Sequence, residues 1–269
     1  MVLEQYFKVK WIERKEHAFF LGFVYSLIGI VSARLIFPSS VGIMSIAFAS
    51  ILMVPSLSVL LKLEENAEIR EKKFSIRMLI HDHKDIFKVY IFLFLGIFLA
   101  YSLVALISSN LSIQKMFSTQ LKSVGIKGFA FFDNPWISIV MNNLLVMVVC
   151  FVLSIVYGAG SVLFLTWNAS VWGVAFAYFV KQQYPQGANV FIGFSKSFLP
   201  FLPHMMTEAI AYISAAIVGG IVSKAVLREK LFSKKFHHII TDAIILMAVA
   251  FLLVIIAGFI EVNFYWNVS

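Results

Sequence analysis

Two ionisable side chains lie one helical turn apart in an apolar stretch of the chain that is long enough to cross a bilayer. His204 and Glu208 follow Pro203 in the stretch from Pro200 to Lys224. A charged group inside a membrane costs on the order of 3 kcal/mol on insertion scales, so such residues need a polar partner, a water-filled path or a ligand. Residues four apart share one face of a helix, so His204 and Glu208 can hydrogen-bond or exchange a proton. Pro203 is expected in the first turn of this helix, where its missing N–H is harmless.

Other polar side chains enter, interrupt or end apolar runs elsewhere in the chain: Asn142, Asn143, Asn168, Glu261 and Asn263. In the topology predicted below, all of these except Asn168 lie with His204 and Glu208 in the outer half of the membrane, which favours one shared polar site. The alternative is that they only hold helices together, since interhelical hydrogen bonds contribute about 0.6 to 2 kcal/mol each. Arg34 ends the first apolar run, and it either extends to the membrane surface or serves as a counter-charge for a glutamate.

Two further segments contain residue types that ligate metals. They are the run His81, Asp82, His83 and Asp85, and the pair His237 and His238. Residues two apart on a helix do not face each other, and no second cluster completes a coordination shell, so we expect no metal site at either place. The chain also lacks the H-E-x-x-H and G-x-S-x-G elements of hydrolases. We therefore predict no catalytic residue, no cofactor and no metal ligand. An intramembrane hydrolase with Glu208 as its base is the least favoured alternative.

The composition predicts a polytopic membrane protein. Hydrophobic residues make up 61% of the 269 residues and charged residues 13%, and the mean hydropathy is +0.90. A transmembrane helix needs roughly 20 apolar residues, and suitable runs lie at about 18–37, 41–61, 89–108, 137–157, 160–180, 198–223 and 240–262. We predict an all-α bundle of about seven spans. Six is the alternative, because only the short run from Gly158 to Ser161 separates the fourth and fifth spans, which could be a re-entrant pair.

The distribution of basic residues orients the bundle. Most of the 22 Lys and Arg residues lie in the N-terminal segment and in the second and sixth connections, which share one side of a seven-span arrangement. Lys and Arg accumulate on the cytoplasmic side of membranes. We predict a basic cytoplasmic segment 1–17, a transmembrane domain 18–262 and a short extracytoplasmic tail 263–269, in the plasma membrane. The net charge of +8 follows from this asymmetry, and without a basic soluble domain it does not indicate nucleic-acid binding.

Two smaller features complete the pattern. The third connection has apolar residues at helical spacing, namely Ile113, Met116, Phe117, Leu121 and Val124. This spacing predicts a helix in the outer interface, or else a docking surface for an extracytoplasmic partner. The run Val31-Ser32-Ala33 resembles a signal cleavage site, but the acidic residues Glu4, Glu13 and Glu16 before it fit a signal peptide poorly. We therefore expect the first span to be retained.

Several of these residues together match a family pattern in the C-terminal half of the chain. They are Asn142-Asn143, Gly158 and Gly160, Asn168 with Gly173, Pro203-His204 with Glu208, Gly219-Gly220, and Ile260-Glu261. Over about residues 140 to 262 the chain resembles the stage II sporulation protein M family of bacteria and archaea. The paired Asn with Pro-His-x-x-x-Glu is the specific part of the likeness. The family commonly has Gly after Pro-His, where this chain has Met205.

The resemblance implies an integral membrane protein whose best-known relatives are scaffolds that recruit peptidoglycan hydrolases to the septal membrane during forespore engulfment. Two classes of function remain open. In the first, the protein is a scaffold and the polar residues fix helix packing. In the second, it is a transporter or channel for a small solute, an ion or protons, and the polar residues line the path. We favour the scaffold, surrounded by the lipid bilayer, with a homodimer as the default oligomer, protein partners in or outside the membrane, and no nucleic acid.

Overall fold

The computed structural model of the chain describes residues 15–68, 76–125, 134–157, 162–184, 189–231 and 233–265. Within these residues every regular element is a helix, which confirms the predicted all-α bundle. The helices are α2 (Lys15–Ile36), α3 (Val41–Glu68), α4 (Ile76–Ile107), α5 (Asn110–Met116), α6 (Ser118–Gly125), α7 (Pro135–Tyr157), α8 (Val162–Gln183), α9 (Val190–Arg228) and α10 (Lys234–Tyr265). The predicted terminal segments 1–17 and 263–269 lie largely outside the described residues. The backbone of His81, Asp82, His83 and Asp85 is described, but their side chains are not.

Six of the described helices are long and apolar enough to cross a membrane, namely α2, α4, α7, α8, α9 and α10. The apolar part of α3 within the described residues, Val41–Leu57, is shorter. The pair in doubt from the sequence, α7 and α8, consists of two separate helices, and each has the length of a full crossing. The chain is thus a multi-pass membrane protein with six or seven apolar helices, and the shortest candidate is α3.

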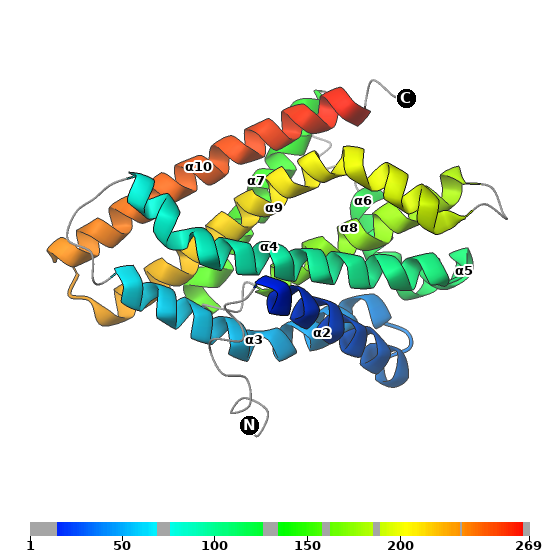
Figure 1. Cartoon of the computed structure of the whole chain (residues 1–269), viewed down its shortest axis with the longest axis horizontal. Helices are drawn as coiled ribbons and strands as arrows, with labels where there is room; N and C mark the ends of the chain where they lie inside the picture. Colours follow the sequence, from blue (N-terminus) through cyan, green and yellow to red (C-terminus); the bar gives the residue numbers. More distant parts are fainter. Residues whose placement is uncertain are drawn as a thin grey trace.

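The long helices run side by side and form two groups (Figure 1). In one group α9 packs against α7 and α10. In the other, α4 packs against α2 and α8, and α2 also packs against α3. Contacts of α9 with α8 and α4 join the two groups. In Figure 1 the helix α10 lies along the upper edge, and α2 and α3 lie along the lower edge.

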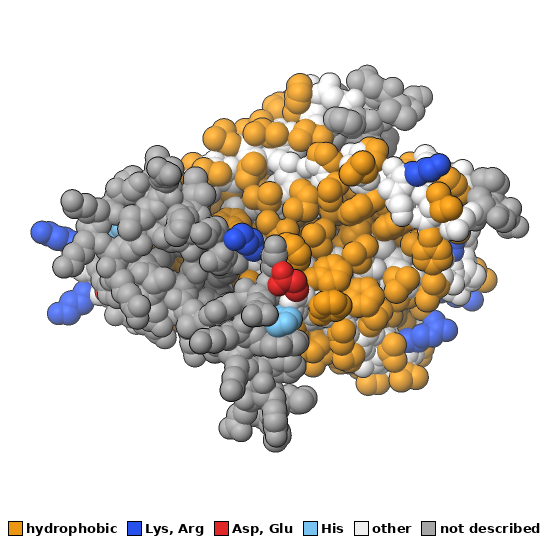
Figure 2. All heavy atoms as spheres, in the orientation of Figure 1, with side chains coloured by type: hydrophobic (Ala, Val, Ile, Leu, Met, Phe, Trp, Pro, Cys, Tyr) orange, Lys and Arg blue, Asp and Glu red, His pale blue; other side chains and the backbone are white. Residues whose placement is uncertain are grey.

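The surface of the bundle is largely apolar, as expected for helices that face lipid. Figure 2 shows hydrophobic side chains over much of one face. Large apolar residues of α7 and α10 are exposed, among them Leu145, Val148, Leu252, Ile256 and Phe259. Both helices therefore present large apolar residues on their outer side.

Glycines allow several helix pairs to approach at the level of the backbone. A Cβ atom at Gly22 of α2 would meet the carbonyl oxygen of Leu93 in α4, and one at Gly96 would meet that of Phe19 in α2. Gly219 of α9 lies in the same way against the backbone of Phe151 in α7. Small residues at such crossings are typical of membrane helices, because packing and not hydrophobic exclusion holds them together. These glycine faces are used within one chain.

The third connection does not form the single interfacial helix that the sequence predicts. It forms two short helices, α5 and α6, which meet at Phe117. Ile113 and Phe117 are completely buried, so this part of the apolar face is covered within the chain. The buried Gln120 side chain donates a hydrogen bond of 3.1 Å to the carbonyl of Gly42, at the start of α3. The apolar residues do lie on helices, and Ile113 and Phe117 pack into the bundle itself.

A lysine from another helix covers the C-terminal end of α4. The last turn of α4 contains no basic residue, although its final carbonyl groups have no partners inside the helix. The Nζ atom of Lys181 in α8 donates to the carbonyl of Leu106 at 3.3 Å and also to that of Ser108. The positive charge there complements the negative end of the helix dipole. Lys181 thus ties the end of α4 to α8.

The helix that bears the candidate site starts earlier than the sequence indicates. The side chain of Asn189 accepts hydrogen bonds from the amides of Phe191 and Ile192 and so caps the N-terminus of α9. Pro203 therefore lies inside the helix, and the prediction that it occupies the first turn is wrong. The 39 residues of α9 make it the longest described helix, with a length of about 58 Å at a rise of about 1.5 Å per residue.

Candidate functional site

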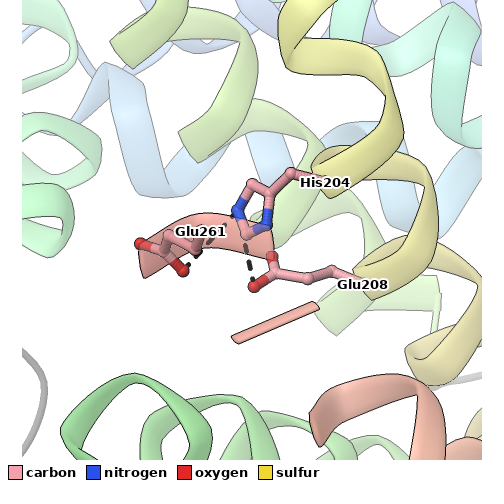
Figure 3. Close-up of side chains that lie close together, drawn as sticks. All are labelled: His204, Glu208 and Glu261. Carbon is pink, nitrogen blue, oxygen red and sulfur yellow. Dashed lines mark ion pairs between the residues drawn. The ribbon is translucent and has the colours of Figure 1, made fainter. Parts of the chain in front are cut away.

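Four polar side chains from three helices meet inside the group formed by α7, α9 and α10. They are Asn143 of α7, His204 and Glu208 of α9, and Glu261 of α10, and we call them the polar cluster (Figure 3 shows the three ionisable members). The helices bring them together because small residues at the crossings allow close approach. Gly258 of α10, for example, lies against the side chain of Val140 in α7.

The imidazole of His204 lies between the two carboxyl groups. Its Nε2 atom is 3.7 Å from Oε1 of Glu208 and 3.6 Å from Oε2 of Glu261 (Figure 3). Its Nδ1 atom is 3.3 Å from the carbonyl oxygen of Ala257 in α10. A carbonyl oxygen only accepts hydrogen bonds, so Nδ1 carries the proton of this contact and Nε2 faces the carboxyl groups. His204 is therefore oriented by the backbone of α10.

The paired asparagines have different positions. The Nδ2 atom of Asn143 donates a hydrogen bond to Oε1 of Glu208, and the Oδ1 atom of Asn143 lies 3.4 Å from Nδ2 of its neighbour Asn142. Asn143 is buried, whereas Asn142 is exposed. Asn143 thus holds the carboxyl group of Glu208 in place, and Asn142 supports it from the outside.

Aromatic rings enclose the histidine on its other side. The ring of Trp172 in α8 packs edge to face against His204 with 5.1 Å between centroids, and that of Phe201 lies at 6.2 Å. His204 is 1% exposed and Glu208 is 2% exposed, whereas the side chain of Glu261 is 29% exposed. The polar cluster is therefore closed around His204 and Glu208 and reaches the surface at Glu261.

The members of the polar cluster lie at different positions along their own helices. Trp172, which contacts His204, lies near the middle of α8, while Glu261 lies close to the C-terminal end of α10. The sequence alone indicated a common depth in the outer half of the membrane. Because Glu208 and Glu261 lie within 3.7 Å of the imidazole, these side chains share one level of the bundle, which the contact with Trp172 relates to the middle of α8.

The other predicted site residues do not join the polar cluster. Asn168 and Asn263 each donate a hydrogen bond of 2.8 Å to a carbonyl of their own helix, at Phe164 and Phe259 respectively. Pro203 is exposed, and its carbonyl accepts a hydrogen bond of 2.7 Å from the hydroxyl of Thr207. Pro203 and Asn263 are exposed, and these hydrogen bonds of Asn168 and Asn263 stay within their own helices.

The proposed counter-charge, Arg34, lies elsewhere in the bundle. Its Nη1 atom is 2.7 Å from the sulfur of Met116 in α5. Among the described residues, no ion pair joins Arg34 to Glu208 or Glu261. Sequence reasoning had instead missed Ala257 and Trp172, which contact His204. The carbonyl of Ala257 leaves no signal in the sequence, and Trp172 is recognisable only as an aromatic residue beside Gly173 in a span.

The comparisons with known proteins agree with this picture. A family model described as Stage II sporulation protein M matches residues 89–264, which extend from α4 almost to the end of α10 and contain the whole polar cluster. The match begins well before residue 140, where the resemblance seen in the sequence starts. No curated protein and no solved structure gives a significant match. Because the family model covers well over half of the 269 residues, the chain belongs to the stage II sporulation protein M family of membrane proteins.

Proposed function

We propose that this protein is a scaffold of the plasma membrane that binds other proteins, and that the polar cluster fixes α7, α9 and α10 into one rigid unit. The observation that carries this proposal is that the polar side chains face one another across helices. Asn143 reaches from α7 to Glu208 on α9, and His204 reaches from α9 to the backbone of α10. Such contacts stabilise helix pairs by about 0.6 to 2 kcal/mol each. A framework of this kind suits a protein that holds partners in a fixed arrangement.

The family supports the same proposal. Its name refers to a sporulation protein, and the resemblance implies a scaffold that recruits enzymes of the cell wall. The match over residues 89–264 does not carry the sporulation role over to this chain. We propose partner proteins in the membrane or at its outer surface. A homodimer is the oligomer that we expect by default.

The test is to purify the cross-linked protein from the membranes in which it is naturally made. A scaffold is expected to bring down one or a few proteins in fixed stoichiometry. The variant Glu208→Gln keeps the shape of the side chain and should retain these partners and the oligomeric state, both read from the mass of the complex. A native protein that carries no partner at a fixed ratio would contradict the proposal.

One observation favours transport as a second candidate function. His204 and Glu208 are both buried, Glu261 is partly exposed, and both carboxyl groups lie within 3.7 Å of the imidazole. A series of ionisable groups that leads from the interior of a membrane bundle to its surface is the arrangement of proton relays.

Flux measurements in liposomes separate the two functions. Native protein, His204→Ala and Glu208→Gln are compared under a pH gradient, and His238→Ala serves as the control because His238 forms a similar pair with Asp242 on α10. Flux that both variants of the polar cluster lose and the control keeps would establish transport. No flux from protein that is shown to be folded is the result that the scaffold predicts.

A further inference from the structure

One atom each of His204, Glu208 and Glu261 lies within 4.8 Å of the other two. Imidazole nitrogen and carboxylate oxygen are common ligands of divalent metal ions in proteins. We propose that the polar cluster binds one divalent transition-metal ion, with His204, Glu208 and Glu261 as its protein ligands. The inference concerns the same residues as the proposed function but does not depend on the scaffold role.

The distances between the ligand atoms fit an ion better than direct hydrogen bonds. The Nε2 atom of His204 is 3.7 Å from Glu208 and 3.6 Å from Glu261, whereas N–H···O bonds are usually about 2.7 to 3.2 Å long. Two ligands at about 2.1 Å from a tetrahedral zinc ion are about 3.4 Å apart. The two separations from Nε2 are close to this value, and the two carboxylate oxygens lie within 4.8 Å of each other.

The orientation of His204 points to a cation at the same position. Because Nδ1 donates to the carbonyl of Ala257, the neutral imidazole presents the lone pair of Nε2 to the carboxyl groups of Glu208 and Glu261. A lone pair that faces two carboxylates is repelled unless a proton or a metal ion lies between them. A proton on Nε2 balances one carboxylate, whereas a divalent ion balances both and leaves a neutral centre in an apolar bundle.

No other charge of the described residues balances the two carboxyl groups. Helix α7 contains no charged residue at all. Lys181 of α8 binds the carbonyl groups at the end of α4, and Lys196, the nearest lysine before His204 in α9, is exposed. On α10 the other charged residues and the histidines, among them His238 and Asp242, lie near the opposite end of the helix from Glu261. A divalent cation bound between His204, Glu208 and Glu261 would balance both carboxyl groups.

The residues behind the ligands are those that metal sites in proteins usually have. A metal-binding histidine commonly donates its other ring N–H to a backbone carbonyl, and a ligating carboxylate commonly accepts an additional hydrogen bond. Here Ala257 accepts from His204, and Asn143 donates to Glu208. The partly exposed side chain of Glu261 provides an entry for the ion.

The ligand set narrows the choice of metal. One imidazole with two carboxylates suits zinc, iron or manganese, and it lacks the thiolate that favours copper(I). Three protein ligands leave at least one coordination position for water or for another molecule. The sequence did not reveal this set, because Glu261 lies on a different helix from the His204 and Glu208 pair and its approach depends on the packing of α10 on α9.

The experiment uses the full chain in detergent or nanodiscs. After treatment with a chelator, the protein is incubated with Zn²⁺ or with Co²⁺, desalted, and its metal content is measured by mass spectrometry, together with the absorption spectrum of the cobalt form. We expect one ion per native chain. Glu261→Gln is expected to lower the affinity by about tenfold or more, and because this side chain is partly exposed the variant should fold normally.

Two controls make the result specific. His238→Gln removes a histidine that lies 3.6 Å from Asp242 on the same helix, and it should bind the metal as the native chain does. Cys150→Ser removes the single cysteine, and an unchanged cobalt spectrum in this variant supports ligation by nitrogen and oxygen only.

Several outcomes would overturn the proposal. They are no bound zinc or cobalt in native protein that is shown to be folded, an affinity that Glu261→Gln and His204→Ala leave unchanged, or a cobalt spectrum that depends on Cys150. Metal binding with no protein partners would overturn the scaffold and leave the metal site standing. Protein partners in the absence of bound metal would overturn the metal site and leave the scaffold standing.

Discussion

At the scale of single residues, the paired asparagines show how position divides the roles of neighbours. Asn143 and Asn142 are adjacent in α7, yet only Asn143 is buried and hydrogen-bonded to Glu208. Consecutive residues of a helix lie about 100° apart around its axis, so both cannot face the same partner. The paired motif therefore consists of one residue that contacts the carboxyl group and one that supports its amide.

This division gives the first prediction. Asn143→Ala removes the hydrogen bond to the buried carboxyl group of Glu208 and should lower the free energy of unfolding by about 1 to 2 kcal/mol. Asn142→Ala, at the neighbouring exposed position, should change it by less than about 0.5 kcal/mol. Cys150 is completely buried and is the single cysteine, so its reaction with a thiol-specific dye during heating reports unfolding directly. Equal effects of the two substitutions would contradict the view that only Asn143 holds the carboxyl group of Glu208.

Part of the polar cluster could be predicted from the sequence, and part could not. The approach of Glu208 to His204 follows from their spacing of four residues, and the presence of Asn143 and Glu261 followed from a predicted common depth. Asn168 and Asn263 were predicted beside them, but each instead bonds the carbonyl four residues earlier in its own helix. Side chains of this kind choose between a local carbonyl and a distant partner, and sequence patterns do not distinguish the two.

At the scale of the elements, α9 is the helix on which the site depends. It contributes two of the four members of the polar cluster, and it contacts both α7 and α10. Its approach to α7 depends on Gly219, since a side chain at this position would meet the backbone of Phe151. A small residue there lets the helices come close enough for Asn143 to reach Glu208.

The second prediction concerns this crossing. Gly219→Ala should lower the thermal unfolding temperature by several degrees, because overpacking against a backbone costs about 1 to 3 kcal/mol and outweighs the gain of about 1 kcal/mol in helix propensity. Ser195→Thr also adds one methyl group to α9, but at an exposed position, and should change the temperature little. The dye reaction of Cys150 measures both. A more stable Gly219→Ala variant would show that α7 and α9 do not touch at this point.

The third prediction concerns the end of α4. Lys181→Met keeps the length of the side chain but removes the donor and the charge that lie on the final carbonyl groups of α4. The free energy of unfolding should fall by about 1 kcal/mol. Lys196→Met, at an exposed position of α9, is the matched control and should leave it unchanged. Equal stability of both variants would mean that water replaces Lys181 without loss.

The elements were easier to predict than their ends. Long apolar runs identify the spans because a membrane helix must satisfy its backbone internally. The start of α9 was missed because the capping residue Asn189 precedes an apolar run interrupted by Pro200 and Pro203. The two-helix form of the third connection was missed because the break at Phe117 depends on how α5 and α6 pack against the bundle.

At the scale of the whole molecule, the two groups of helices contribute unequally to the likeness with the family. The matched segment begins at residue 89 within α4 and leaves out α2 and α3. The polar cluster lies entirely in the group of α7, α9 and α10. The helices α2 and α3 belong to the other group, and their sequences follow only the general requirements of a membrane bundle.

The fourth prediction is the topology of the chain. The distribution of Lys and Arg predicts that the N-terminus lies in the cytoplasm and the connection between α4 and α7 outside. In the Cys150→Ser background, a cysteine at Asn110, which is exposed in α5, should react with a membrane-impermeant maleimide applied to intact cells. A cysteine at Lys230, which is exposed after α9, should react only after the membrane is permeabilised. The opposite pattern would invert the bundle and place the partly exposed Glu261 on the cytoplasmic side.

The contact between His204 and the backbone of α10 also has a consequence for the biosynthesis of the protein. Helices leave the ribosome in chain order, so α9 enters the membrane with His204 and Glu208 when Asn143 is already present but Ala257 and Glu261 have not yet been made. The pair α9 and α10 must therefore settle in the bilayer together. A nascent chain that ends before Ala257 lacks the acceptor that orients the histidine, and proteases that remove unfinished membrane proteins should recognise it. The last helix to be synthesised completes the polar interior of the molecule.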